Sequence, residues 1–270
     1  HVEKAIKELD FFVVQDIFLT ETGKLADVIL PATTFAEKDG TFTNTERRVQ
    51  RVRKAIEPVG NSKLDWEITC MLAEKMNSKG FGFNNASEIM DEIASLVPSY
   101  GGISYERVEE VGLQWPCPTK DHAGTPYLHK EKFTRGKGRF MPLKYIPSAE
   151  LPDKEYPLIL TTDRSLYQFH TGTMTRKCPR LNAMKKEELV EINQEDAAKL
   201  GINDGDMVKV SSRRGEVKAK AKITDTVNKG LVSMTFHFYE SPTNVLTNDA
   251  LDPVSKIPET KVCAVKVEKV

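Results

Sequence analysis

The feature that most constrains the fold of this chain is a series of short apolar segments, separated by turn residues, that begins near residue 156. One helical pattern interrupts the series; it begins after Asn193 and ends at Gly201. Six short strands joined by turns predict a closed β-barrel, because closure removes unpaired strand edges. The predicted strands cover residues 158–161, 189–192, 207–211, 215–223, 231–235 and 263–267.

The polar segment after the first of these strands predicts a ligand loop. It reads TDRSLYQFHTGTMT at residues 162–175. Arg164 has a planar fork suited to phosphate oxygens, and Thr171 and Thr173 add hydroxyl donors. Gly172 lets a ligand approach the backbone closely, because it has no Cβ. The segment therefore indicates capture of a large, phosphate-bearing cofactor, and a polar loop without a ligand is the alternative.

The first hundred residues have the pattern of an α/β domain. Residues 11–15 and 28–30 predict short buried strands, and the first ends at a polar pair, where ligands sit in open α/β sheets. Two helices are expected: one begins at Ser62, with Asp65 completing a capping box, and the other covers residues 86–96. The charged residues 47–53, by contrast, predict an exposed extended segment.

Length and pattern together predict three parts in this chain of 270 residues. They are the end of an α/β domain at residues 1–98, a connecting segment at 99–153 that is rich in Gly and Pro, and the barrel at 154–270. The chain starts at His1 without methionine. We therefore expect it to be part of a longer polypeptide or one subunit of a split one.

Charge and cysteine usage exclude several functional classes. Acidic and basic residues number 39 each, so the basic excess of a nucleic-acid-binding protein is missing. No run approaches the length of a membrane span. The four cysteines are scattered without C-x-x-C spacing, which argues against a zinc or iron–sulfur site and favours free thiols in a reducing cytoplasm.

Three long motifs give the chain a resemblance to a known family. They are VVQDIFLTETGKLADVILPATTFAEKDGTFTNTERRVQ at residues 13–50, LILTTDRSLYQFHTGTMT at 158–175 and FHFYESPTNVLTNDALDP at 236–253. In these motifs and their order the chain resembles the molybdopterin oxidoreductases that use bis-(molybdopterin guanine dinucleotide), bis-MGD, with molybdenum or tungsten. Within that superfamily it is most similar to the C-terminal portion of the formate dehydrogenase catalytic (α) subunit. One position departs from the family pattern: Asp163 stands where the family usually has glycine.

The resemblance implies a fold and a set of cofactor contacts. The barrel should be a double-psi β-barrel that follows the end of a Rossmann-like domain. In that first portion, Asp16 and Asp65 could accept hydrogen bonds from a guanine edge, and Gln15 and Lys38 could reach ribose or phosphate. Asp65 as a helix cap and Lys38 as a plain surface residue are the alternatives. In the barrel the implied cofactor-binding residues are Thr162, Asp163, Arg164, His170, Thr171, Gly172, Thr173, Phe236, Asn244 and Lys261.

The resemblance also implies a reaction and partners. The reaction is the two-electron interconversion of formate and carbon dioxide, with electrons passed to iron–sulfur centres. The metal-ligating cysteine or selenocysteine, its neighbouring histidine and the cysteines of a [4Fe-4S] cluster belong to an earlier part of the family's polypeptide. We therefore expect no catalytic or metal-binding residue here, and no activity from this chain alone. The expected partners are the N-terminal remainder of the catalytic subunit and electron-transfer subunits of the iron–sulfur, diaphorase or hydrogenase type.

Three other functions stay open at this stage. The first is a nitrate reductase or another oxo-transfer member of the superfamily, which only the residues around the metal would distinguish. The second is a scaffold subunit of an electron-transfer complex that has lost its pterin; the polar residues 171–175 and Asn244 argue against it, because a lost site has no reason to keep them. The third is a free-standing binding module unrelated to redox chemistry.

Overall fold

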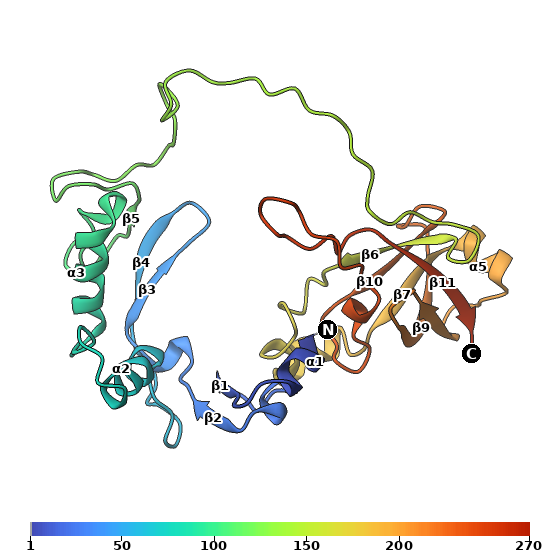
Figure 1. Cartoon of the computed structure of the whole chain (residues 1–270), viewed down its shortest axis with the longest axis horizontal. Coiled ribbons are helices and arrows are strands. Elements are labelled where there is room, and N and C mark those ends of the chain that lie inside the picture. The colour runs from blue at the N-terminus through green and yellow to red at the C-terminus, as the bar shows by residue number, and fades with distance from the viewer. Residues whose placement is uncertain (1) are drawn as a thin grey trace. The chain divides into compact units, whose positions relative to one another are not determined.

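The computed structural model describes residues 2–270, which form two compact units, one ending at Met141 and one beginning at Pro142 (Figure 1). The boundary falls inside residues 99–153, the predicted connecting segment. None of the described helices is long and apolar enough to cross a membrane.

The first unit contains a short parallel pair of strands and a separate antiparallel sheet. After helix α1 (Val2–Lys7), strand β1 (Val13–Asp16) pairs in parallel with β2 (Val28–Pro31). The antiparallel sheet consists of β3 (Gly40–Thr43), β4 (Arg48–Val52) and β5 (Leu113–Gln114). Two longer helices complete the unit, α2 (Asp65–Lys75) and α3 (Ala86–Leu96), so the prediction of an α/β first portion is confirmed.

Residues 47–53 were predicted to be extended and exposed: the extended conformation is confirmed by strand β4, but the exposure is wrong. β4 lies between β3 and β5 in the sheet, and Val49 is buried. The Arg51 guanidinium lies 4.0 Å from the centre of the Tyr105 ring and forms an ion pair with Glu109 at 3.2 Å. The alkyl part of the Arg51 side chain is thus largely covered although its charge is paired. The second strand partner of β4 is β5, which lies too far along the chain for a local pattern to reveal.

The start predicted for the first long helix is also wrong. α2 begins at Asp65, and the backbone N–H of Leu64 donates to the Glu67 carboxylate at 3.3 Å. The Ser62 hydroxyl instead donates to the carbonyl of Val59 at 2.7 Å, so it closes the preceding turn. The second long helix, α3, covers the predicted residues and is capped by Asn85.

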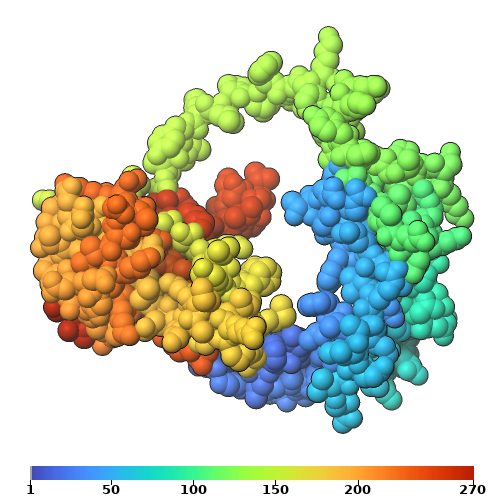
Figure 2. Space-filling model, turned by 180° about the vertical axis from the view of Figure 1, so that it is seen from behind, coloured from blue at the N-terminus to red at the C-terminus, as the bar shows by residue number. Residues whose placement is uncertain are grey.

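Part of the predicted connecting segment belongs to the core of the first unit. Ile103, Val108 and Cys117 are buried against Val49 of β4 and Met90 of α3. Apolar side chains without helical or strand spacing conceal this role in the sequence. A turn joins Phe133 to Gly136, and residues 138–147, yellow-green in Figure 2, then have no helix or strand and carry the exposed rings of Phe140 and Tyr145.

The second unit is the predicted barrel. Its strands are β6 (Leu158–Asp163), β7 (Leu189–Asn193), β8 (Met207–Ser211), β9 (Glu216–Thr224), β10 (Leu231–Thr235) and β11 (Cys263–Lys269). They close in the order β10-β6-β11-β8-β9-β7. Alternate residues of β9 are buried, because inward side chains fill the barrel while lysines face out. Helix α5 (Gln194–Leu200) ends at Gly201, whose φ is 65°.

The barrel has a two-fold pattern in its strand pairing. If β6 is exchanged with β9, β7 with β10 and β8 with β11, the closed strand order is unchanged. The two parallel pairs, β6–β10 and β7–β9, then replace each other. Each of the six pairings joins a strand of the first half to a strand of the second half. This is the mixed six-stranded arrangement of a double-psi β-barrel, so that prediction is confirmed.

Candidate functional site

The candidate site in the barrel unit lies where the parallel strands β6 and β10 end. The register places Thr235 beside Asp163, so the loops that follow both strands leave from the same end of the barrel. Carboxyl ends of parallel strands are where loops gather around ligands. The Lys261 ammonium donates to the carbonyl of Thr162, and the Thr162 hydroxyl donates to the carbonyl of Thr260 at 3.1 Å. The structure thus brings Lys261 to the predicted phosphate loop.

His237 holds this loop to the barrel, and the sequence analysis did not identify it. The ring is fully buried, and its Nε2 accepts from the backbone N–H of Ser165 at 2.8 Å. The neutral ring therefore carries its proton on Nδ1, which donates to the carbonyl of His170. These partners lie 72 and 67 residues earlier in the sequence, so no local pattern marks the role of His237. The one sequence signal was that His237 directly follows Phe236, a predicted site residue.

Gly172 lies close to the segment after β10 that carries His237. Its φ is +72°, and a Cβ built on it would lie 2.7 Å from the carbonyl oxygen of His237 and 2.7 Å from Cδ of Arg176. The group that approaches Gly172 closely in the structure is thus the carbonyl of His237, and the approach of a ligand stays a prediction. The neighbouring hydroxyls of Thr171 and Thr173 bond to each other at 2.8 Å, near the exposed crest of the loop.

Phe236, Arg164 and His170 form an aromatic and cationic group at the same end of the barrel. The Arg164 guanidinium lies 5.4 Å from the centre of the Phe236 ring, and the His170 ring lies 6.1 Å from it. Within residues 2–270, Arg164 forms no ion pair, so its guanidinium is available to an anion. This arrangement presents a flat ring beside a free positive charge.

Asp163 and Asn244 differ in how much of their polar capacity is already used. One Asp163 carboxylate oxygen accepts from the backbone N–H of Arg164 at 2.7 Å, which removes that donor from any ligand. Asn244 is exposed in the short 3-10 helix η5 (Thr243–Val245). Its backbone carbonyl accepts from the Thr247 hydroxyl, and its side-chain amide takes no part in that bond. The Asn244 amide is therefore free to meet a ligand.

The predicted residues of the first unit form a separate group. The Asp65 carboxylate accepts from Gln15 Nε2 at 2.8 Å and pairs with the Lys38 ammonium. Burial raises the pKa of the Asp65 carboxyl, but the hydrogen bonds from Lys38 and Gln15 outweigh it, so the pKa lies below its usual value. Asp16 turns its carboxylate to the backbone N–H of Phe18 at 3.1 Å and lies outside this pairing. Asp65 is thus held ionised by a neighbouring lysine rather than serving as a helix cap.

Glu188 is a buried carboxyl that joins β7 to the end of β10. Its Oε1 accepts from the backbone N–H of Thr235 at 2.9 Å and of Leu189 at 3.1 Å, and its Oε2 accepts from the Thr235 hydroxyl. Burial raises the pKa of this carboxyl, because these bonds do not fully replace water. Glu188 thus binds Thr235, the residue directly before Phe236.

We expect Glu188→Gln to flatten the pH dependence of stability. A raised pKa in the folded state gives stability that is present below the carboxyl's unfolded pKa, about 4.3, and is lost as the pH rises through the folded pKa. The amide can keep the bonds at Oε1 and donate to the Thr235 hydroxyl. The free energy of unfolding in urea, measured from pH 4 to 8, should fall with rising pH more in the parent than in the variant. A matched change at the exposed Glu187 should leave this slope in place, and a parent–variant difference that stays constant across the range would contradict the assignment.

Comparison with known proteins places both units in described families. Residues 158–264 match the family described as Molydopterin dinucleotide binding domain, and residues 1–75 match Molybdopterin oxidoreductase. Among the residues from 2 onward, no group of three or more His, Cys, Asp or Glu side chains could hold a metal ion.

Two curated relatives and one solved structure cover nearly all of the chain. It is 58% identical over 273 residues to the F420-dependent formate dehydrogenase 2 subunit alpha of Methanococcus maripaludis, and the match covers 100% of this chain and 40% of the relative. It is 39% identical over 279 residues to the assimilatory nitrate reductase catalytic subunit of Bacillus subtilis, with 98% and 39% covered. Acetylene hydratase from Pelobacter acetylenicus superposes with a TM-score of 0.74 at 19% identity over 99% of this chain and 41% of that one, which shows the shared fold. The chain thus spans about 40% of the length of the relatives it matches.

Proposed function

Because this chain belongs to the molybdopterin oxidoreductase family, we propose that it is the C-terminal, cofactor-binding portion of a formate dehydrogenase catalytic subunit. The observation that carries the proposal is the gathering of Arg164, Phe236 and Lys261 at one end of the barrel, within the residues that match the dinucleotide-binding family. Formate is favoured over nitrate because the identity is 58% with the formate dehydrogenase and 39% with the nitrate reductase.

The residues at the barrel end fit one half of bis-MGD. The free Arg164 guanidinium and the Lys261 ammonium would hold the pyrophosphate, and the Thr171 hydroxyl would add a donor. Phe236 would pack on a flat ring, and the free amide of Asn244 would bond to a pterin amide edge. His170, Thr162, Gly172 and Thr173 would shape the loop that carries these donors. When bound, the metal and pterin supply the two-electron chemistry, and these side chains bind and orient the group.

The group formed by Gln15, Lys38 and Asp65 would serve a guanine nucleotide in the first unit. An ionised Asp65 can accept two parallel N–H bonds from the guanine edge, and Lys38 both keeps it ionised and can reach a phosphate. Asp16 would join them once its bond to the Phe18 N–H is exchanged for one to the ligand. The charges of Asp65 and Lys38, which are paired in the absence of ligand, would thus bind the guanine edge and the phosphate.

The proposal assigns the reaction centre to the remainder of the catalytic subunit. That remainder would supply the cysteine or selenocysteine ligand to molybdenum or tungsten and the [4Fe-4S] cluster. Electrons would leave through iron–sulfur subunits to an acceptor such as the coenzyme F420 named for the relative. The test is to assay the full-length subunit with a dye, once with formate and once with nitrate. Formate oxidation is expected, and turnover of nitrate alone would favour the oxo-transfer alternative.

Lys261→Ala should weaken binding of guanosine 5′-diphosphate, GDP, to the 270-residue chain. The loss of a charge-assisted bond to phosphate costs about 1.5–3 kcal/mol, or roughly 10- to 150-fold in Kd. Calorimetric titration measures this, and the unfolding of the ligand-free chain should hardly change, because Lys261 is exposed. Lys220→Ala, an exposed lysine on β9, is the matched control. Equal losses from both lysines would mean that Lys261 has no particular place at the ligand.

Asn244→Ala should lower the pterin content of the full-length subunit without changing the stability of the ligand-free protein. A hydrogen bond from the Asn244 side-chain amide to the pterin contributes about 0.5–1.5 kcal/mol, so occupancy should fall about two- to tenfold at limiting cofactor. Pterin is measured by fluorescence after oxidation. A loss of several degrees in the melting temperature of the cofactor-free protein, with occupancy falling only in proportion, would make Asn244 a structural turn residue.

A further inference from the structure

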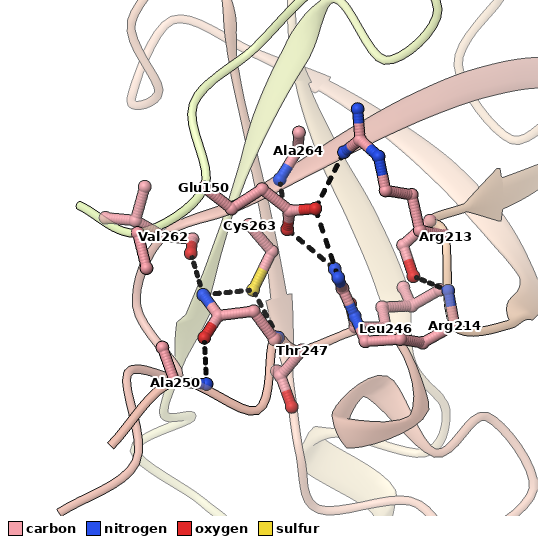
Figure 3. Close-up of polar contacts among 12 residues, drawn as sticks. Glu150, Arg213, Arg214, Leu246, Thr247, Ala250, Val262, Cys263 and Ala264 are labelled. Atoms are coloured by element: carbon pink, nitrogen blue, oxygen red, sulfur yellow. Dashed lines mark hydrogen bonds and ion pairs between the residues drawn. The ribbon is translucent and has the colours of Figure 1, made fainter.

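A network of polar contacts centred on Glu150 joins the stretch before β6 to the segments around Leu246 and Val262 (Figure 3). The Glu150 side chain is 12% exposed and accepts from Arg213 Nη1 at 2.7 Å and from Arg214 Nη2 at 2.6 Å. It also accepts from the backbone N–H of Ala264 at the start of β11, at 3.1 Å. Burial raises the pKa of the Glu150 carboxyl, but the hydrogen bonds from Arg214, Ala264 and Arg213 hold it below its usual value, so the carboxylate is charged.

Arg214 extends this network to the loop that carries Asn244. Its Nε and Nη2 donate to the carbonyl of Leu246 at 3.1 and 2.9 Å. Leu246 is fully buried in the barrel core and lies two residues after Asn244. The planar guanidinium therefore grips Glu150 with one edge and the Leu246 carbonyl with another, which a flexible ammonium could not do at once.

Asn248 carries the network on to Lys261. Its amide donates to the carbonyl of Val262 at 2.8 Å, and its backbone N–H donates to the buried sulfur of Cys263 at 3.3 Å. Val262 directly follows Lys261, whose ammonium reaches the end of β6. The same chain of contacts thus fixes the backbone beside both proposed ligand residues.

We propose that Glu150 and Arg214 are positioning residues for the dinucleotide site, because they hold residues 244–248 and 261–262 so that Asn244 and Lys261 face the ligand. This inference rests on the proposed function. Both residues act through the backbone of other residues, Arg214 through the carbonyl of Leu246 and Glu150 through the N–H of Ala264. Glu150 belongs to the stretch that leads into the barrel, so this stretch takes part in building the site.

Arg214→Lys tests the positioning role without removing charge. In the ligand-free 270-residue chain, amide hydrogen exchange at residues 244–250 should become roughly tenfold faster or more, because the Leu246 carbonyl loses its two bonds. Amides in the middle of β7 and β9 should be unaffected, which shows that the barrel is folded. Arg213→Lys is the matched control, since Arg213 lies in the same turn and pairs with Glu150 but does not contact Leu246.

GDP binding by the same variants distinguishes the inference from the proposed function. Arg214→Lys should weaken GDP binding by about tenfold, and combining it with Lys261→Ala should cost less than the sum of the two single losses. A fully additive double variant, or Arg214→Lys with exchange and binding like the parent, would overturn the positioning role alone. Failure of the parent chain to bind GDP would overturn the proposed function and the role built on it.

Discussion

Replacing Gly172 with alanine is expected to destabilise the barrel unit by about 2–5 kcal/mol. A left-handed backbone costs a non-glycine residue about 1–2 kcal/mol, and forcing a methyl group into a packed position adds roughly 1–3 kcal/mol. Both apply here, because φ is +72° and the new Cβ would lie 2.7 Å from the His237 carbonyl oxygen. A backbone atom cannot swing away as a flexible side chain can, so the loop itself must shift. GDP binding should fall with it.

A matched glycine separates the two causes. Gly205 has φ +82° but nothing within 4 Å of a built Cβ, so Gly205→Ala should show the backbone cost alone. The comparison uses urea unfolding followed by far-UV circular dichroism. Trp66 and Trp115 both lie in the first unit, and their fluorescence reports that unit as an internal reference. Equal losses for both variants would show that the approach to His237 is not tight.

Replacing His237 with alanine should be the other large loss, about 2–5 kcal/mol together with release of the loop. The substitution removes the acceptor for the Ser165 N–H and the donor for the His170 carbonyl at a fully buried position. Each unsatisfied polar group costs about 1–3 kcal/mol, and the cavity adds to that. Amide exchange at Ser165 should rise far more than exchange in the middle of β8.

Two conservative variants divide this effect between its halves. The His237→Asn amide can donate where Nδ1 donates, to the His170 carbonyl, but does not reach the Ser165 N–H. The longer His237→Gln side chain can place its oxygen where Nε2 accepts from Ser165. Each should recover part of the stability lost in His237→Ala. If both behave like alanine, packing of the ring rather than its hydrogen bonds holds the loop.

The barrel could be predicted because its signals are local. In β9, Val217 and Ala219 point inward while Lys218 and Lys220 point out, and this alternation can be recognised from adjacent residues alone. The first unit was harder. β4 gains a partner from residues 113–114, and Cys117 joins the core from a segment without periodicity. Such long-range packing leaves no local spacing to recognise.

The candidate site was predictable only in part, for the same reason. The resemblance pointed to Gln15, Lys38 and Asp65, which the structure brings together. It missed His237, whose partners lie 72 and 67 residues away, and Arg214, whose carboxylate partner lies 64 residues away. The residues proposed to face the ligand thus had a chemical signature, whereas the residues that hold them did not.

The pairing of the barrel halves has a consequence for the order of events during translation. β6, which carries the loop of residues 164–175, pairs only with β10 and β11, and β7 pairs only with β9 and β10. While β6, β7 and β8 leave the ribosome they have no strand partners, and their apolar faces must wait for residues synthesised later. The first pairing available is the β8–β9 hairpin, and the barrel closes only when β11 has emerged. A pterin cofactor bound as proposed could therefore be held by this loop only after β11 has been synthesised and has closed the barrel.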